Sequence, residues 1–289
     1  MDRKGIIMAG GSGNRLFPLT KTISKHLLNV FDKPMIYYPL STLMLAGIKE
    51  ILIITNNENL LFFKKLLGNG NQLGLSIKYE IEDSPDGIAN GLIIGEKFLG
   101  ENPCTLILGD NLFYGNNLRD ILSSAYSRNE TTIFSYHVND PERYGIPDFN
   151  SKGEIERIIE KPLNPSNNLA ITGMYFFDPK AIKLAKSIKA SKRGELEITD
   201  LINLYIKKYK VHLENLRRGL VWFDMGTYNS LIEASTFAHF VNSRQGLKIC
   251  CPEEIALRLN LIKPFQFLEL IKTMPTNEYS KYLLEIAKD

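Results

Sequence analysis

Short apolar segments alternate with longer segments of helical periodicity in the first third of the chain, and this alternation limits the fold more than any other feature. Strand-like runs occupy residues 4–9, 50–55, 76–81 and 104–108, and helical spacing is found in residues 35–47, 58–67 and 86–98. This alternation favours a mostly parallel sheet, Rossmann-like, with helices on both faces. Ligands of such sheets collect at the carboxyl ends of the strands, so we expect the functional residues there.

The second half of the chain has a different pattern. Strand-like segments lie at residues 131–138, 153–160, 170–178 and 219–224, with fewer helical segments between them. We interpret them as a mixed extension of the sheet. From residue 227 onward the apolar residues recur with helical spacing, which predicts a helical C-terminal region.

The composition argues against several classes of protein. The 289 residues are 44% hydrophobic and 23% charged, which allows a sizeable core. No apolar run approaches the roughly 18 residues of a membrane span, and the first residues do not read as a secretory signal. We therefore expect a cytoplasmic protein without a membrane partner. A net charge of +3 with both signs interspersed gives no nucleic-acid footprint, so the anionic partner is expected to be small.

The cysteines give no sign of a disulfide framework or a zinc site. Cys104, Cys250 and Cys251 are odd in number, and the two adjacent ones do not easily pair with each other. We expect reduced, structural thiols.

A glycine-rich turn follows the first strand-like run. Gly10, Gly11, Ser12 and Gly13 have small or absent side chains, so their backbone N–H groups can curl around an anion such as a phosphate. A Walker loop would end in Gly-Lys-Ser/Thr, and the dinucleotide fingerprint would need glycine at the position of Leu16. Neither motif fits, and a purely structural turn is the alternative interpretation.

Three cations after this turn favour anion binding. Arg15 can bind a polyphosphate through the planar, forked guanidinium group, and Lys25 can bring a mobile point charge. Lys21 lies between these two residues in the sequence. Both kinds of cation suit a reaction in which negative charge builds up on phosphoryl oxygens. A solvated basic face is the alternative.

Longer motifs carry a resemblance to a known family. GIIMAGGSGNRLFPLT and SKHLLNVFDKPMIYYPLSTLMLAGI open the chain, and SPDGIAN, LILGDNLFYG, YHVNDPERYGI, IEKP, ITGMYFFD, RGELEITD, WFDMGT and RQGLKICCPEEIA follow in order. Together they span essentially the whole sequence. The chain resembles the sugar nucleotidyltransferases, and among them the glucose-1-phosphate thymidylyltransferases.

The resemblance implies a reaction and a domain organisation. Glucose 1-phosphate would attack the α-phosphorus of dTTP, giving dTDP-glucose and pyrophosphate with Mg²⁺ as cofactor, for deoxysugars such as rhamnose. The implied fold is the nucleotidyltransferase or GT-A-like sheet. Residues 1–226 would form the core, with a nucleotide-binding part of about 1–130 and a sugar-phosphate-binding part of about 131–226, and residues 227–289 a helical assembly and regulatory region.

The same resemblance assigns roles to individual positions. Arg15 and Lys25 would be catalytic, and Asp110 and Asp224 would hold the metal ion. The nucleotide would be bound by Gly10, Gly11, Ser12, Gly13, His26, Glu82, Pro85, Gly87 and Asp110, and the sugar phosphate by Gly145, Glu160, Lys161, Ile171, Tyr175 and Arg193.

Two departures from the family pattern fall on the nucleobase. The family usually has glutamine where this chain has His26 and Glu82. An amide both donates and accepts hydrogen bonds, whereas an ionised Glu82 only accepts. Three outcomes are open: a protonated Glu82, a base pocket rebuilt around backbone groups near Gly87, or an altered base preference such as UTP or CTP.

A second site and an assembly are also implied by the resemblance. A nucleotide-sugar end product would bind at a subunit interface of a homotetramer and inhibit, at Tyr114, Gly115, Arg218, Gly219, Cys251, Glu254, Ile255 and Arg258. An ordinary helical cap with exposed charges is the alternative for the C-terminal region. A non-catalytic sensor of nucleotide sugars is the alternative to an enzyme.

Overall fold

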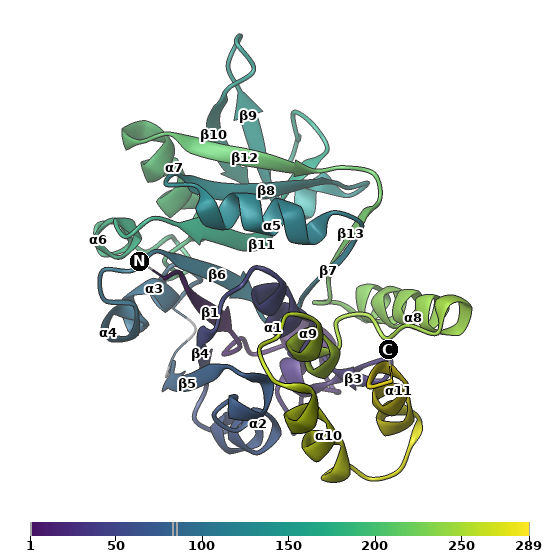
Figure 1. Ribbon diagram of the computed structural model, residues 1–289. Helices are drawn as coiled ribbons and strands as arrows, with labels where there is room; N and C mark the ends of the chain where they lie inside the picture. The colour runs from purple at the N-terminus through teal and green to yellow at the C-terminus, as the bar shows by residue number, and fades with distance from the viewer. Residues whose placement is uncertain (1, 83, 85, 289) are drawn as a thin grey trace.

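The computed structural model describes residues 2–82, 84 and 86–288, and its centre is a seven-stranded sheet (Figure 1). The strands, in their order across the sheet, are β12 (Val211–Leu216), β8 (Thr131–His137), β11 (Leu169–Phe177), β6 (Cys104–Leu108), β1 (Lys4–Met8), β4 (Glu50–Thr55) and β5 (Ser76–Ile81). β11 runs antiparallel to both of its neighbours, and the other pairs are parallel. The expected mixed, mostly parallel sheet is confirmed.

Both faces of the central strands are buried, which explains why β1, β4 and β6 read as continuous apolar runs, whereas the edge strands β5 and β12 are more exposed. In β1, Ile6 belongs to one hydrophobic cluster and Ile7 to another, because successive side chains point to opposite faces. α1 (Tyr37–Leu45), α2 (Leu60–Leu67) and α5 (Leu118–Ser127) contribute to the cluster around Ile7. The opposite cluster is completed by α3 (Asn90–Ile94), α4 (Glu96–Leu99), α6 (Ala181–Ala185) and α7 (Ile198–Lys208).

Three short antiparallel pairs stand beside the main sheet. β9 (Gly145–Phe149) pairs with β10 (Ile155–Glu160), β7 (Asn111–Gly115) with β13 (Leu220–Asp224), and β2 (Asn29–Val30) with β3 (Lys33–Pro34). The β9–β10 hairpin projects at the top of Figure 1. The β7–β13 pair joins segments more than 100 residues apart, so it brings the end of the strand-like segment 219–224 next to the end of β6.

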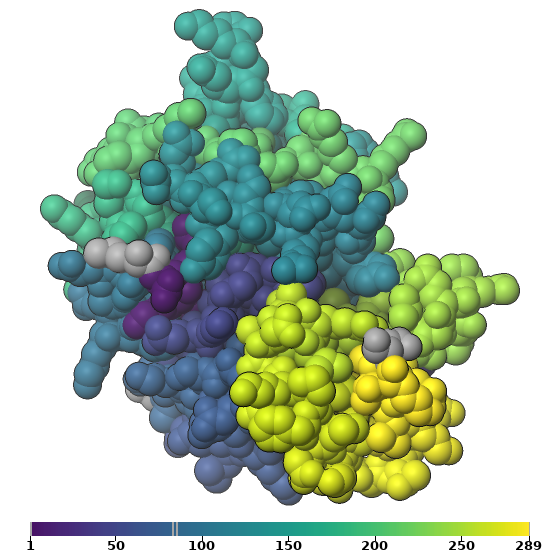
Figure 2. All heavy atoms as spheres, viewed as in Figure 1, coloured from purple at the N-terminus to yellow at the C-terminus, as the bar shows by residue number. Residues whose placement is uncertain are grey.

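The C-terminal region is helical, as the periodicity predicts. It consists of α8 (Tyr228–Gln245), α9 (Pro252–Arg258), α10 (Pro264–Lys272) and α11 (Glu278–Ile286). α9, α10 and α11 add Ala256, Phe267 and Leu283 to the cluster around Ile7, and Figure 2 shows them as one yellow mass against the N-terminal part of the chain. α8 packs separately, on β2 and β13. In the described part of the chain, no helix combines the length and the apolar character that crossing a membrane requires.

The sequence patterns did not predict some of these strands and helices. β7, β9 and β12 lack a clear run of β-branched residues, and the predicted helix 86–98 is two short helices that meet at Gly95. Four 3₁₀ turns complete the described structure: η1 (Asn14–Leu16), η2 (Lys25–Leu27), η3 (Asn71–Leu73) and η4 (Pro141–Arg143). Of these, η1 and η2 matter for the site because they position the cations of the glycine-rich segment.

Candidate active site

A cavity of about 600 Å³ lies at the carboxyl ends of β1, β5 and β6. This is the edge at which an open parallel sheet binds its ligands. The cavity is lined by all the residues predicted for catalysis, nucleotide, metal and sugar phosphate that the structure describes: Gly10, Gly11, Ser12, Gly13, Arg15, Lys25, His26, Glu82, Gly87, Asp110, Gly145, Glu160, Lys161, Ile171, Tyr175, Arg193 and Asp224. Pro85, also predicted, lies outside the described residues.

Two glycines of the glycine-rich turn have close neighbours, and at Gly13, with a φ of 65°, a Cβ atom would lie 2.8 Å from Cγ2 of Thr20. A Cβ atom on Gly10 would lie 2.6 Å from Oε2 of Glu82. The turn continues into η1, which carries Arg15, and the hydroxyl of Thr20 donates a hydrogen bond of 3.0 Å to the carbonyl of Gly13. The turn is thereby held open toward the cavity.

Two of the predicted cations face the two aspartates. Lys25, in η2, forms an ion pair with Asp110. A Cβ atom on Gly226 would lie 2.5 Å from Nη2 of Arg15 and 3.0 Å from Oδ1 of Asp224, so these two groups are neighbours. Lys21 is exposed.

The β7–β13 pair brings Asp110 and Asp224 together. Asp224 ends β13 opposite Asn111, and the backbone N–H of Met225 donates to the carbonyl of Asp110 at 2.9 Å. Burial, and then the charge of Asp110, raises the pKa of Asp224 to about 6. Burial would also raise the pKa of Asp110, but the ion pair with Lys25 holds it below its ordinary value.

Two carboxylates that repel each other in a buried cavity fit a divalent cation. Mg²⁺ is usually held by one or two carboxylates plus substrate phosphates, with water completing an octahedron. Within residues 2–82, 84 and 86–288, no group of three or more His, Cys, Asp or Glu side chains is placed to hold a metal ion. The donor set of Asp110 and Asp224 therefore suits an ion shared with a nucleotide better than a permanent structural metal.

Asn111, which the sequence analysis did not single out, holds the side chain of Asp110 in place. Its Nδ2 donates to Oδ1 of Asp110 at 3.1 Å, and its own Oδ1 accepts from the backbone N–H of Gly173 at 3.1 Å and from Nε1 of Trp222 at 2.6 Å. Asn111 is 1% exposed. Its signal in the sequence was its place directly after the aspartate in LILGDN.

The opposite end of the cavity is strongly polar. The hydroxyl of Thr199 donates to Glu160 at 2.6 Å, and Lys161 lies 3.4 Å from the same carboxylate. Arg193 reaches the cavity from the loop before α7 and pairs with Glu197 at 2.9 Å. Gly145, Ile171 and Tyr175 complete this end, together with Arg143 and Tyr144, which the sequence reasoning did not single out.

His26 lines the cavity, but its ring is already engaged. The side chain is 2% exposed, Nδ1 lies 3.0 Å from the hydroxyl of Ser24, and the ring also hydrogen-bonds to the backbone of Ala9. Burial, with the nearby charge of Lys25, lowers the pKa of His26 to about 3, so the ring is neutral at physiological pH. We therefore see His26 as a support for the cavity wall.

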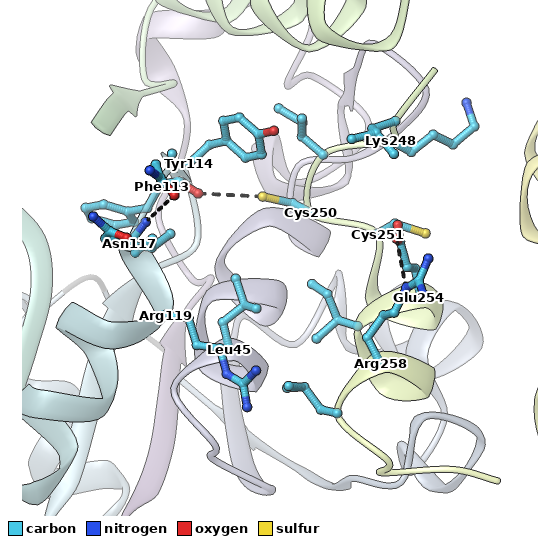
Figure 3. A pocket seen from close by; sticks show the side chains of 17 residues that line it. Leu45, Phe113, Tyr114, Asn117, Arg119, Lys248, Cys250, Cys251, Glu254 and Arg258 are labelled. Carbon is cyan, nitrogen blue, oxygen red and sulfur yellow. Dashed lines mark hydrogen bonds and ion pairs between the residues drawn. The ribbon is translucent and has the colours of Figure 1, made fainter. Parts of the chain in front are cut away.

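A second cavity, of about 370 Å³, lies between residues 113–119 and residues 247–259 (Figure 3). Tyr114 and Gly115 line one side, and Cys251, Glu254, Ile255 and Arg258 the other, with Leu45 and Arg119 also facing it. Lys248 lines the cavity with its stem, and its ammonium group pairs with Asp32 at 2.8 Å. Arg218 and Gly219, predicted for the same site, are exposed in the turn between β12 and β13 and are not among the lining residues. They lie close by, since a Cβ atom on Gly115 would be 2.1 Å from the carbonyl oxygen of Gly219.

Comparison with family models decides the identity of the fold. Residues 4–240 match the nucleotidyl transferase family, and this range includes the glycine-rich turn, both aspartates and the residues predicted for the sugar phosphate. The chain belongs to this family. The resemblance found in the motifs is thereby confirmed, and so is the expectation of an enzyme.

Relatives of this nucleotidyl transferase match it over nearly their full length. The glucose-1-phosphate thymidylyltransferase of Xanthomonas campestris pv. campestris (strain B100) is 51% identical over 287 residues, which are 99% of this chain and 97% of the relative. The enzyme of the same name from Neisseria meningitidis serogroup A is 48% identical over 286 residues, 99% of each chain. A solved Bacillus anthracis structure, provisionally assigned to the same activity and determined with sucrose, has a TM-score of 0.75 and 38% identity, and the match covers 82% of this chain and 95% of that one.

Proposed function

We propose that this nucleotidyl transferase is a glucose-1-phosphate thymidylyltransferase, which makes dTDP-glucose and pyrophosphate from dTTP and glucose 1-phosphate. The observation that carries the proposal is the single cavity in which the glycine-rich turn, the aspartate pair and the polar sugar-side residues meet. The names of the relatives at 51% and 48% identity support the choice of substrates.

The proposed reaction is an in-line displacement between two anions. A phosphate oxygen of glucose 1-phosphate forms a bond to the α-phosphorus, and the bond from that phosphorus to the bridging oxygen breaks, so pyrophosphate leaves with the electron pair. Little covalent chemistry is left for the protein, and catalysis is mainly positioning and charge neutralisation.

The residues divide this work by position. Lys161 and Arg193 would hold the attacking phosphate, and Glu160 would accept hydrogen bonds from sugar hydroxyls. Arg15 and Lys25 would bind the triphosphate and the departing pyrophosphate. Asp110 and Asp224 would hold Mg²⁺, which when bound lowers the cost of negative charge on the phosphoryl oxygens.

One assay separates the candidate functions. The enzyme is given glucose 1-phosphate, Mg²⁺ and each of dTTP, UTP, CTP, ATP and GTP, and pyrophosphate release is followed. Turnover chiefly with dTTP supports the proposal, and turnover chiefly with UTP or CTP indicates an altered base preference. If no nucleotide reacts, the chain is a sensor of nucleotide sugars.

A matched pair of variants tests the role of the cavity in that assay. Asp224→Asn should lower turnover about 10²- to 10³-fold, as expected when one group that stabilises developing charge is removed. Asp120→Asn, the same change at an exposed position of α5, should leave turnover unchanged. Wild-type turnover of Asp224→Asn would count against the metal site.

Mg²⁺ dependence, the pathway and the location belong to the same proposal. Chelation should abolish turnover and added Mg²⁺ should restore it. The product would feed deoxysugar synthesis, such as that of dTDP-rhamnose, in the cytoplasm. A homotetramer is expected from the family resemblance, and light scattering of the purified protein measures its mass.

The second cavity suits a regulatory nucleotide sugar. Its apolar wall from Phe113, Leu45 and Ile255 can pack on a base, while Arg119 offers positive charge to a diphosphate. A dTDP-deoxysugar should inhibit without competing with glucose 1-phosphate. Arg119→Ala should weaken that inhibition and leave turnover without inhibitor unchanged.

A further inference from the structure

Glu82 is a buried carboxyl group on the wall of the active-site cavity. It directly follows β5, its backbone N–H donates to the carbonyl of Thr55 at 2.8 Å, and the residue is 7% exposed. Its Oε1 atom is buried and has no hydrogen-bond partner among the described residues. Native proteins pair most buried polar atoms, so this oxygen, on a residue that lines the cavity, lacks the partner that a bound ligand can supply. Rotation about the last side-chain bond of a glutamate is only weakly restricted, so either oxygen of the carboxyl group can face the cavity.

The surroundings of Glu82 disfavour its ionised form. Asn90, at the start of α3, donates a hydrogen bond to the carboxyl group, but the nearby charged group is Asp86, which repels a second negative charge. On the β1 side the carboxyl group meets Gly10, which brings no charge. Burial, with a smaller effect of Asp86, raises the pKa of Glu82 to about 7.

The position of Glu82 indicates which part of the substrate it meets. Asp110 follows β6 and the glycine-rich turn follows β1, whereas Ile171 and Tyr175, predicted for the sugar phosphate, belong to β11 beyond β6. Glu82 follows β5, at the edge of the sheet away from these β11 residues. Gly87 and Ile88, which follow Glu82 in the chain, and Met8, which ends β1, line the cavity and carry no charge. A flat base with one polar edge fits such a wall.

We propose that Glu82 recognises the pyrimidine of the nucleotide as a neutral carboxylic acid, donating its O–H to a ring carbonyl and accepting a hydrogen bond from the adjacent ring N–H. The inference rests on the proposed function of this cavity. A protonated carboxyl group has one donor and one acceptor side by side, which is the pattern of a glutamine amide. An ionised carboxylate would instead place negative charge against the carbonyl oxygen of thymine or uracil.

The inference predicts a pH dependence that belongs to this one residue. If only the protonated form accepts the base, KM for dTTP should be constant below pH 6 and rise about tenfold between pH 6 and pH 8. Glu82→Gln keeps the donor and the acceptor but does not titrate, so its KM should lack this rise. Both proteins share the ionisation of the nucleotide and of every other side chain, so the difference between their profiles isolates Glu82.

A second variant and a binding measurement test the role of Glu82 without relying on Glu82→Gln alone. Asp86→Asn removes the repelling charge, so the rise in KM should begin at lower pH. Calorimetry of dTTP binding with Mg²⁺ at pH 8, in two buffers of different ionisation enthalpy, should show uptake of nearly one proton by the wild type and none by Glu82→Gln. The wild-type measurement stands even if a variant folds poorly.

The outcomes distinguish this inference from the proposed function. Turnover of dTTP with the same pH profile in wild type and Glu82→Gln, and no proton uptake on binding, would overturn the role of a neutral Glu82 and leave the thymidylyltransferase proposal standing. Absence of dTTP turnover at any pH in either protein would overturn both.

Discussion

At the scale of single residues, Asn111 shows how one side chain can hold a charged group in place. Its amide accepts hydrogen bonds from Trp222 and Gly173 on one side and donates to Asp110 on the other. Trp222 lies in β13 and Gly173 in β11, whereas Asp110 directly precedes Asn111 in the turn between β6 and β7. The carboxylate proposed for the metal ion therefore depends on a residue that does not itself need to touch the substrate.

Replacing Asn111 should lower activity through Asp110. Asn111→Leu leaves Nε1 of Trp222 without its acceptor and Asp110 without its donor, and we expect kcat/KM to fall about 10- to 100-fold with a higher Mg²⁺ requirement, as for other partners of metal ligands. Initial rates over a series of Mg²⁺ concentrations provide the measurement. Asn102→Leu, which removes a partly buried amide outside the cavity lining, is the control. An unchanged Mg²⁺ requirement would contradict the positioning role.

At the scale of elements, two loops that approach the cavity from different parts of the chain are joined. The backbone N–H of Leu196 donates to the carbonyl of Asp86 at 2.6 Å, and the N–H of Ala89 donates to the carbonyl of Leu196 at 3.2 Å. Arg193 precedes Leu196 in the same loop. The loop after β5 therefore supports the loop that brings Arg193 to the cavity.

Gly87 is the point at which the two loops touch. It has a φ of 103°, and a Cβ atom there would lie 2.5 Å from the backbone N and O of Leu196. We expect Gly87→Ala to separate the loops and to raise KM for glucose 1-phosphate at least about tenfold, in steady-state assays with dTTP saturating, because contacts of 1–2 kcal/mol or more are lost.

Gly153→Ala is the matched control for this prediction. Gly153 also has a positive φ, of 77°, but no atom lies within 4 Å of the Cβ position. Gly153→Ala should lower the free energy of unfolding by about 1–2 kcal/mol and leave KM for glucose 1-phosphate unchanged. An equal rise in KM in both variants would show that backbone strain, and not the contact with Leu196, is the cause.

The junction of α9 and α11 contains a buried carboxyl group. Glu253 is 6% exposed and accepts a hydrogen bond of 2.6 Å from the hydroxyl of Tyr279. Burial raises the pKa of Glu253 in the folded protein. In the unfolded chain its pKa is about 4.3, so over a range of pH above that value the folded protein holds a proton that the unfolded chain has lost.

The free energy of unfolding should therefore fall with pH because of Glu253. The contribution of this residue is complete below the unfolded pKa and is lost as the pH rises from there to the raised folded pKa. Urea unfolding of the wild type and of Glu253→Gln between pH 4 and pH 8 measures it, and the wild type should lose stability relative to the variant over this window. A difference that grows in favour of the wild type with rising pH would contradict the assignment.

At the scale of the whole molecule, the three cysteines report on global unfolding. Cys104 lies in β6 at the centre of the sheet, and Cys250 and Cys251 precede α9, and all three are buried. Burial raises the pKa of Cys104 and that of Cys250 to about 12, and that of Cys251 well above its ordinary value. The thiolate is the reactive form of cysteine. Burial therefore protects these thiols from reagents in two ways: it limits access to the sulfur atom, and it keeps the thiol protonated.

A thiol reagent should therefore find no fast-reacting cysteine in the native protein and three in denaturant. Release of a chromophore from an aromatic disulfide reagent at pH 8, followed over minutes, makes the measurement, and the slow native rate should follow the unfolding rate across urea concentrations. Rapid native reaction of two thiols would instead show that the region before α9 opens locally.

Patterns close together in the chain determined much of this protein. The apolar runs of β1, β4 and β6 mark strands buried on both faces, and the glycines after β1 mark the turn that lines the cavity. The alternating residues of β5 mark a strand at the edge of the sheet that is mostly exposed. These features depend on residues within about ten positions, which is why they can be read without the fold. The C-terminal helices belong to the same class.

The tertiary structure alone decided which side chains meet, because the contacts join residues far apart in sequence. The β7–β13 pairing sets Asp224 beside Asp110, the backbone of Ala9 hydrogen-bonds to the ring of His26, and Glu82 is buried beside Gly10. Burial and partners set the charge of a group, and neither is a property of the residue type. The glutamate that stands where the family has glutamine could be identified from the sequence, whereas its ionisation depends on the fold.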